Sequence, residues 1–291
     1  MSVAAPKILT PIASPVGSFS LSVPEGNDPK LAVYRDGQLP PQVLTLVQAL
    51  RTTTPAGAKV LDLGGYIGGF GIAAATAGYQ VVIVEANPHN AACIRESLAA
   101  NQFAHPVRLI EGAIGAESRD SVSFVSNGPW GHVSTPRSSD AATGGVRMYT
   151  LPELLASVGW TAPAFVKMDV EGSELQAVTG AQPWFAGGHR PTILYEANAF
   201  TLDWFGATPS DLNRAFDALG YHRYELDDNG TLRAPGHFEP RCLVDYVVSD
   251  TELAHAAKRS FWSLCKLTLR ALQNESPVAR KHTWRALGLG S

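Results

Sequence analysis

Short runs of consecutive apolar residues recur along the first 250 residues, separated by amphipathic or glycine-rich stretches. Helical periodicity follows several of these runs, as in residues 90–101. This alternation predicts an α/β fold with a doubly wound parallel sheet, in which ligands bind at the carboxyl ends of the strands. The predicted parallel strands are residues 59–63, 80–85, 107–111, 165–169 and 193–196, of which 59–63, 80–85 and 165–169 have the composition of buried strands.

Different patterns flank and interrupt this core. Alternation in residues 19–23 predicts a strand, and the proline-initiated stretch 40–50 predicts a helix, so residues 1–54 are expected to form an N-terminal strand and helix cap. Residues 122–150 lose the helical signal and are rich in Ser, Gly and Pro, which predicts a long polar lid or binding loop. Apolar runs on either side of the Asp228–Gly230 turn predict an antiparallel finish to the sheet.

The first buried strand breaks into glycines, and this turn is the main chemical signal. Glycine lets the backbone turn sharply and approach a ligand, and the following helix offers free N–H groups. The second strand ends in Glu85, about twenty residues further on, which is the spacing at which an acid reaches ribose hydroxyls. The two strands therefore predict a nucleoside-bearing cofactor. No G-x-G-x-x-G follows Leu63, which argues against a dinucleotide and against an NAD-dependent reductase, the first alternative.

Three segments resemble the FkbM family of S-adenosylmethionine (SAM) dependent methyltransferases, in the family's order and spacing: Val60–Gly68, Val166–Glu174 and Ile193–Glu196. The resemblance implies a class I, Rossmann-like seven-stranded sheet, mostly parallel with an antiparallel final hairpin. It makes residues 55–250 the catalytic domain and implies O-methylation of a saccharide or natural-product hydroxyl. Where the family usually has Ala-Asn, this chain has Gly65-Tyr66. A non-catalytic SAM-fold binding protein is the second alternative.

The expected cofactor-binding residues lie at the ends of the first four predicted parallel strands. Asp62 either hydrogen-bonds near the methionine end of SAM or braces the glycine turn, and Ala113 is expected at the adenine edge through its backbone. The full set is Asp62, Gly64, Gly65, Tyr66, Gly68, Glu85, Ala86, Ala113 and Asp169.

Carboxylates crowd the exits of the fourth and fifth strands. Neighbouring acids raise one another's pKa and so supply a general base, which transfer of a methyl group to a hydroxyl can use. His132 is another base expected in the polar loop, unless it is a surface residue. The expected catalytic residues are Asp169, Glu171, Glu196 and His132.

A hard cation is an open alternative at the same place. Asp169, Glu196 and Asn198 could converge on Mg²⁺, whose oxygen ligands would also bind an acceptor diol. The same carboxylates could equally serve without a metal.

Charge and cysteine usage narrow the classes of partner. The net charge is −3, but residues from 251 onward carry seven Lys or Arg against two Glu, so the tail is +5 and the remainder −8. Because residues 1–250 carry this negative charge, we expect the protein to bind a small-molecule acceptor and no nucleic acid. The three cysteines are odd in number and lack C-x-x-C spacing, which fits a reducing cytoplasm better than a disulfide or zinc framework.

Residues 251–291 are expected to form a basic amphipathic helical extension. Its apolar residues recur at helical spacing, with the basic residues mostly off that stripe. Packing on the body or pairing in a homodimer is favoured over membrane association, since the stripe is short and no window approaches the roughly eighteen apolar residues of a membrane span.

Overall fold

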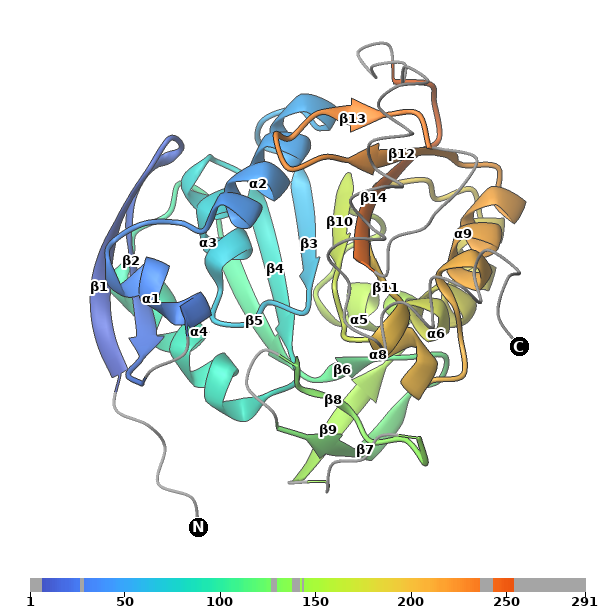
Figure 1. Ribbon diagram of the computed structural model, residues 1–291, viewed down its shortest axis with the longest axis horizontal. Coiled ribbons are helices and arrows are strands. Elements are labelled where there is room, and N and C mark those ends of the chain that lie inside the picture. Colours follow the sequence, from blue (N-terminus) through green and yellow to red (C-terminus); the bar gives the residue numbers. More distant parts are fainter. Residues whose placement is uncertain are drawn as a thin grey trace, which may run out of the picture.

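The computed structural model describes residues 7–26, 29–126, 130–137, 142, 144–235 and 243–253. A central sheet carries helices on both faces, a two-stranded sheet packs on the outer side of the helices on one face, and a four-stranded sheet lies below the central sheet (Figure 1). The central strands, in spatial order, are β13 (Leu232–Arg233), β12 (His222–Leu226), β14 (Leu243–Ser249), β11 (Thr192–Asn198), β10 (Phe165–Met168), β3 (Lys59–Leu63), β4 (Gln80–Glu85) and β5 (Val107–Glu111).

The five strands predicted to be parallel are parallel neighbours, from β11 through β10, β3 and β4 to β5. Strand β14 then pairs antiparallel with both β11 and β12, which confirms the antiparallel finish. The predicted count of seven strands is wrong, because eight strands of the described residues form this sheet. After the turn at Asp228–Gly230 the chain pairs back for two residues, and the Asp227 carboxylate holds this turn by accepting from the Thr231 N–H and from Arg233.

Nine helices lie among the described residues. They are α1 (Pro29–Arg35), α2 (Pro41–Thr53), α3 (Gly69–Thr76), α4 (Pro88–Ala100), α5 (Leu151–Ser157), α6 (Glu174–Gly180), α7 (Gln182–Ala186), α8 (Ala199–Trp204) and α9 (Pro209–Ala218). The parallel strands alternate between two cores, as their period of two requires. Val60 packs with α2, α3 and α4 on one face, whereas Leu61 and Leu63 pack with α5, α6, α7 and α9 on the other.

The N-terminal segment forms a hairpin of β1 (Lys7–Ser14) and β2 (Gly17–Pro24). Phe19, Leu21 and Val23 enter the core on the α2–α4 face, and β2 packs against α3 and α4. The predicted strand at 19–23 and helix at 40–50 are both present, as parts of β2 and α2. The proposed division at residues 54 and 250 remains a prediction, and the predicted C-terminal helix lies outside the described residues from 254 onward.

The segment predicted to be a long polar loop instead contains strands, so that prediction is wrong. Strands β6 (Ala113–Ile114), β9 (Gly144–Tyr149), β7 (Arg119–Val125) and β8 (His132–Val133) form a four-stranded sheet in that spatial order. The sequence gives no strand signal because only the last two residues of β7 are buried and the others are mostly exposed and polar. In Figure 1 this sheet lies below the central sheet and next to α8.

Across the part of the chain that the structure describes, every helix is too short or too polar to cross a membrane.

Candidate functional site

The glycine turn between β3 and α3 lies against two neighbouring strand ends. The N–H groups of Gly64 and Gly65 both donate to the Val84 carbonyl at 3.0 Å. A Cβ placed on Gly64, whose φ is +80°, would lie 1.7 Å from the Asp169 carbonyl oxygen. Gly68, with φ +96°, is the N-cap of α3. Only glycine therefore allows the turn to pass this close to the end of β10.

Glu85 is buried at the end of β4 and binds the same turn. Its Oε2 accepts from the Tyr66 N–H at 2.7 Å, and its Oε1 accepts from the Asn87 N–H at 2.8 Å. Burial raises the pKa of Glu85 to about 7, although these hydrogen bonds oppose the shift. Tyr66 has a φ of 51°, a left-handed conformation that non-glycine residues seldom adopt. Such strain tends to persist at functional sites, where the surrounding structure enforces it.

A cavity opens beside this carboxylate, and we call it the Glu85 pocket. It spans about 590 Å³, part of it open to solvent, between the glycine turn, the end of β5 and the four-stranded sheet. Six of the predicted cofactor residues line it together with His132 and Glu171: Gly64, Tyr66, Glu85, Ala86, Ala113 and Asp169.

A second cavity, the Glu196 pocket, adjoins the first. It spans about 930 Å³ and lies between α1, α2 and the ends of β10 and β11. One wall is apolar, formed by Val33, Val43, Leu46 and Phe70, whereas the other carries Lys167, Asp169, Glu171 and Glu196. Gly64, Tyr66, Asp169 and Glu171 line both cavities, so they form the border between them.

A buried lysine lies beneath the border. The Lys167 Nζ donates to the Gly64 carbonyl at 2.7 Å and lies 3.3 Å from Asp62 and 3.4 Å from Asp169. Burial alone would lower the pKa of Lys167, but Asp169 and Asp62 together raise it above its ordinary value. Burial raises the pKa of Asp62 to about 6, against the opposing charge of Lys167. The lysine therefore stays charged and ties both strand ends to the turn.

Glu196 is a further carboxyl with a raised pKa, as proton-transfer groups often have. Burial, followed by the charges of Asp169 and Glu171, raises the pKa of Glu196 well above its ordinary value. Asp245, opposite Glu196 in the β11–β14 register, also contributes, and burial raises its own pKa to about 7. A carboxylate with a raised pKa is a stronger base once it is ionised.

The predicted Mg²⁺ ligands do not fit a hard cation. The Asn198 Oδ1 accepts from the Phe200 N–H and caps α8, while its Nδ2 faces the Glu196 Oε2 at 3.4 Å. The Lys167 ammonium already places a positive charge beside Asp169. Among the described residues, no three acidic, histidine or cysteine side chains have metal-binding geometry.

The structure separates some residues that were predicted together. Asp62 is fully buried under the turn and Gly68 caps α3, so neither lines a pocket. Gly65 lines only the Glu196 pocket, and His132 lines only the Glu85 pocket.

Two residues were missed. Lys167 had a signal, because a lysine inside a buried strand requires partners, and it lies opposite Asp62 in the β10–β3 register. Tyr34 comes from α1, which was not predicted. It is buried in the Glu196 pocket, and a Cβ on Gly69 would lie 2.2 Å from its hydroxyl.

Comparison with protein families gives one match. The model of the Methyltransferase FkbM domain matches residues 62–223, which include the glycine turn, Glu85 and the acidic strand ends. No curated protein sequence matches the chain.

Solved structures with a similar arrangement have low sequence identity. A TehB-like SAM-dependent methyltransferase from Corynebacterium glutamicum has a TM-score of 0.42 at 13% identity, over 76% of this chain and 93% of that one. A precorrin-6y C5,15-methyltransferase from Geobacter metallireducens has a TM-score of 0.41 at 12% identity, over 72% of this chain and 89% of that one. The T. thermophilus 16S rRNA methyltransferase RsmC, in complex with AdoMet and guanosine, has a TM-score of 0.44 at 14% identity, over 84% of this chain and 50% of that one.

Proposed function

Because the chain belongs to the FkbM methyltransferase family, it is a SAM-dependent methyltransferase, and we propose that it methylates a hydroxyl of a saccharide or glycosylated natural product. One arrangement carries the proposal: the Glu85 pocket and the Glu196 pocket meet at Asp169 and Glu171. A cofactor in the first pocket and an acceptor in the second would meet at this border. Positioning of this kind is the main source of rate in a two-substrate transfer.

The chain's residues fit SAM, which when bound supplies an electrophilic methyl group. Glu85 would accept hydrogen bonds from the ribose hydroxyls, because a carboxylate can accept about four and only three donors contact it here. The backbone at Gly64 has no side chain to keep a ligand away. Lys167 holds the Gly64 carbonyl in place from below.

The Glu196 pocket would hold an amphipathic acceptor. Its apolar wall, including Val43 and Phe70, suits the hydrophobic face of a sugar ring or an aglycone, and its acids suit hydroxyl groups. Glu196 would take the hydroxyl proton as the oxygen attacks the methyl carbon and the carbon–sulfur bond breaks, which leaves a neutral thioether. Asp169, fixed by Lys167, would orient the hydroxyl. Mg²⁺ has no part in this proposed step, since the Asn198 side chain caps α8.

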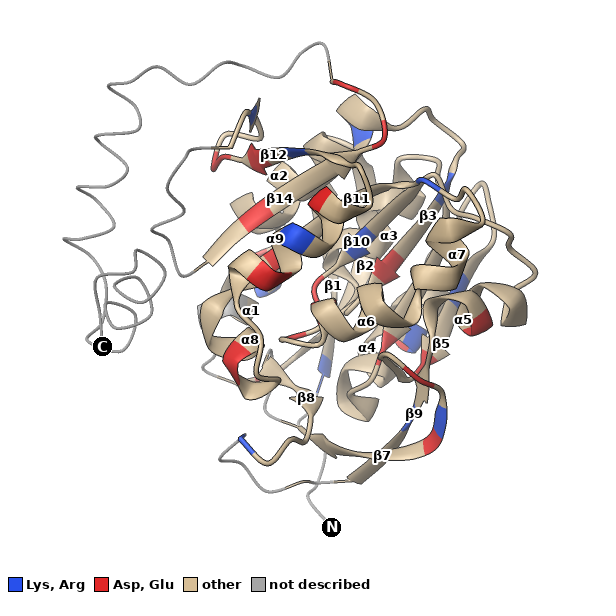
Figure 2. Ribbon diagram, turned by 90° about the vertical axis from the view of Figure 1, so that its right-hand side faces the viewer, with Lys and Arg blue, Asp and Glu red and all other residues tan. Residues whose placement is uncertain are grey.

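We also propose a cytoplasmic enzyme that acts on a small molecule and binds no nucleic acid. On the side that Figure 2 shows, acidic positions on α8 and β14 lie near mixed charges on α9, and the described residues there present no continuous basic face. Phosphate backbones require such a face. A homodimer remains a proposal that depends on residues 251–291.

Transfer of a labelled methyl group tests the reaction. Purified enzyme, SAM labelled in its methyl group and a panel of saccharides, glycosides and amines would be incubated, and label in each acceptor measured. Label in hydroxyl acceptors supports the proposal. Label only in amines contradicts O-methylation, whereas SAM binding without transfer to any acceptor class favours the non-catalytic binding protein.

A further inference from the structure

His132 is a buried histidine with one ring nitrogen that lacks a partner. The residue is 2% exposed on β8 and lines the Glu85 pocket. Its Nδ1 lies 2.8 Å from the Trp130 carbonyl oxygen. A carbonyl can only accept, so in the neutral ring the proton is on Nδ1 and the lone pair is on Nε2. That Nε2 is buried and has no hydrogen-bond partner among the described residues.

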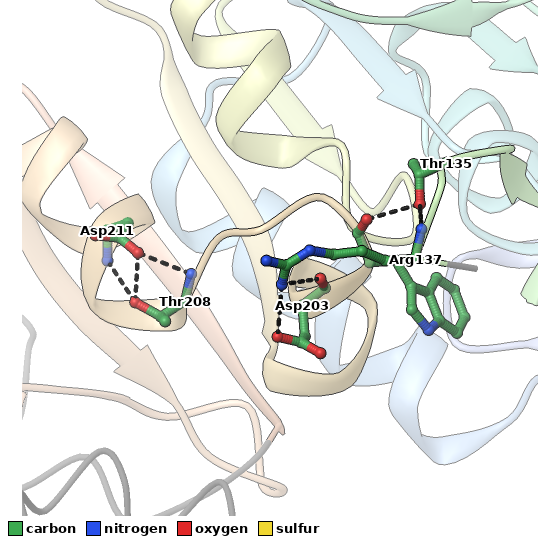
Figure 3. A network of polar contacts seen from close by, with 6 residues as sticks. Thr135, Arg137, Asp203, Thr208 and Asp211 are labelled. Carbon is green, nitrogen blue, oxygen red and sulfur yellow. Dashed lines mark hydrogen bonds and ion pairs between the residues drawn. The ribbon is translucent and has the colours of Figure 1, made fainter. Parts of the chain in front are cut away.

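The ring of His132 is held from a second side. It stacks on Trp204, at the end of α8, with 4.1 Å between ring centroids and 30° between planes. Three residues further on, the Thr135 hydroxyl donates to the Trp204 carbonyl at 2.7 Å, and Arg137 contacts Asp203 (Figure 3). The strap of residues 131–137 is therefore fixed to α8, and the direction of the imidazole is set before any ligand binds.

Because His132 lines the Glu85 pocket, a ligand bound there would be placed to supply the hydrogen-bond donor that its Nε2 lacks. Apolar side chains line the pocket around His132, including Ile114, Phe124 and Val133, as a flat ring would require. The pocket's buried carboxylate, Glu85, comes from the other side, at the end of β4, and suits hydroxyl donors. A donor attached to an aromatic ring is thus the group that this end of the pocket lacks.

We propose that His132 recognises the adenine of SAM by accepting a hydrogen bond from its exocyclic amine at Nε2. This assignment rests on the proposed function, and it replaces the expectation that His132 is a catalytic base. The base would be Glu196, in the other pocket. Selection for adenine then comes from the inserted four-stranded sheet rather than from the central sheet alone.

Binding of two ligands tests the proposal. S-adenosylhomocysteine (SAH) carries the amine, whereas S-inosylhomocysteine has an oxygen acceptor in its place, which would face the Nε2 lone pair. By titration calorimetry, the wild type is expected to bind SAH about tenfold or more tightly than the inosine analogue. Equal binding of the two ligands overturns the proposal for His132 alone. Binding of neither ligand would overturn the proposed SAM site itself.

Variants separate recognition from catalysis and from folding. His132→Phe keeps a ring against Trp204 but no acceptor, and is expected to lose about tenfold in SAH affinity and most of the discrimination. His132→Gln keeps an acceptor and is expected to retain more of both. The matched control is His189→Phe, because His189 also stacks on a tryptophan, Trp184, but lines neither pocket. Unchanged SAH affinity in His132→Phe, with turnover lost, would restore the base hypothesis and contradict ours.

Discussion

Among single residues, Glu196 is the proposed base, and we expect it to determine how turnover depends on pH. Its pKa is raised well above the ordinary value, mainly by burial, and a base acts only when ionised. We expect kcat/KM to rise with pH through this raised value and to level off above it. Glu196→Gln should lower kcat by about 10²–10⁴-fold, measured by methyl transfer.

A neighbouring carboxylate supplies the control for this prediction. Asp245 raises the pKa of Glu196 but does not line its pocket. Asp245→Asn should therefore move the acid limb of the profile to lower pH while leaving the plateau similar. If Glu196→Gln retained the wild-type rate and profile, Glu196 would not be the base.

Gly64 must be glycine for two reasons: its φ is positive, and its backbone lies too close to the Asp169 carbonyl oxygen to leave room for a side chain. A methyl group there would overlap the Asp169 carbonyl oxygen, so Gly64→Ala should destabilise the protein by about 3 kcal/mol or more in urea unfolding. Gly78→Ala is the matched control, since Gly78 has a φ of +91° and open space around it. It should cost only about 1 kcal/mol. Equal costs for the two variants would contradict the close approach.

Residue identities predicted which side chains gather at the strand ends better than the geometry around them. Six of the predicted cofactor residues line one pocket, because the turn and the strand ends follow from apolar runs and glycines. The left-handed Tyr66 and the fixed ring of His132 depend on contacts from distant parts of the chain. No local sequence pattern therefore predicts the backbone conformation of Tyr66 or the position of the His132 ring.

At the scale of elements, Lys167 joins β10 to β3. Lys167→Met would leave Asp62 and Asp169 without their buried countercharge, and should cost about 3–5 kcal/mol of unfolding free energy. The double variant with Asp62→Asn should recover part of that loss. Lys59→Met, at the more exposed start of β3, should stay within about 1 kcal/mol. A cost for Lys167→Met no larger than that of Lys59→Met would contradict the buried pair.

Elements with strong hydrophobic patterns were predictable, and those stabilised by pairing were not. Strands β3, β4 and β10 are nearly continuous apolar runs, so their order along the chain and their burial followed from sequence, whereas β5 at the edge of the sheet has no fully buried residue. Strands β6, β8 and β13 have two residues each, whereas only two residues of β7 and none of β9 are buried. These strands are stabilised by pairing with neighbouring strands, and the sequence of one segment does not predict that pairing.

For the whole molecule, buried carboxyls set how stability depends on pH. Burial raises the pKa of Glu85, Glu174 and Asp245 to about 7, and of Asp62 to about 6. Above the ordinary carboxyl pKa the folded state therefore binds more protons than the unfolded chain, so stability falls as pH rises toward 7. The raised pKa of Lys167 acts only at alkaline pH.

Urea unfolding of the ligand-free protein at pH 5 and pH 8 measures this dependence. We expect lower stability at pH 8, and a smaller difference between the two pH values in Glu174→Gln, whose carboxyl lines neither pocket. Stability that is constant or increases from pH 5 to pH 8 would show that these carboxyls are not protonated in the folded state.

The most direct test of the SAM site is calorimetric titration of SAH into the wild type, Glu85→Gln and Glu111→Gln. Glu111 ends β5 in register with Glu85 but is exposed, so it is the matched control. We predict that the wild type and Glu111→Gln bind SAH alike, and that Glu85→Gln binds about tenfold or more weakly, since a charge-assisted hydrogen bond to ribose is lost. Equal affinity in Glu85→Gln, or a wild type that does not bind SAH, would contradict the account.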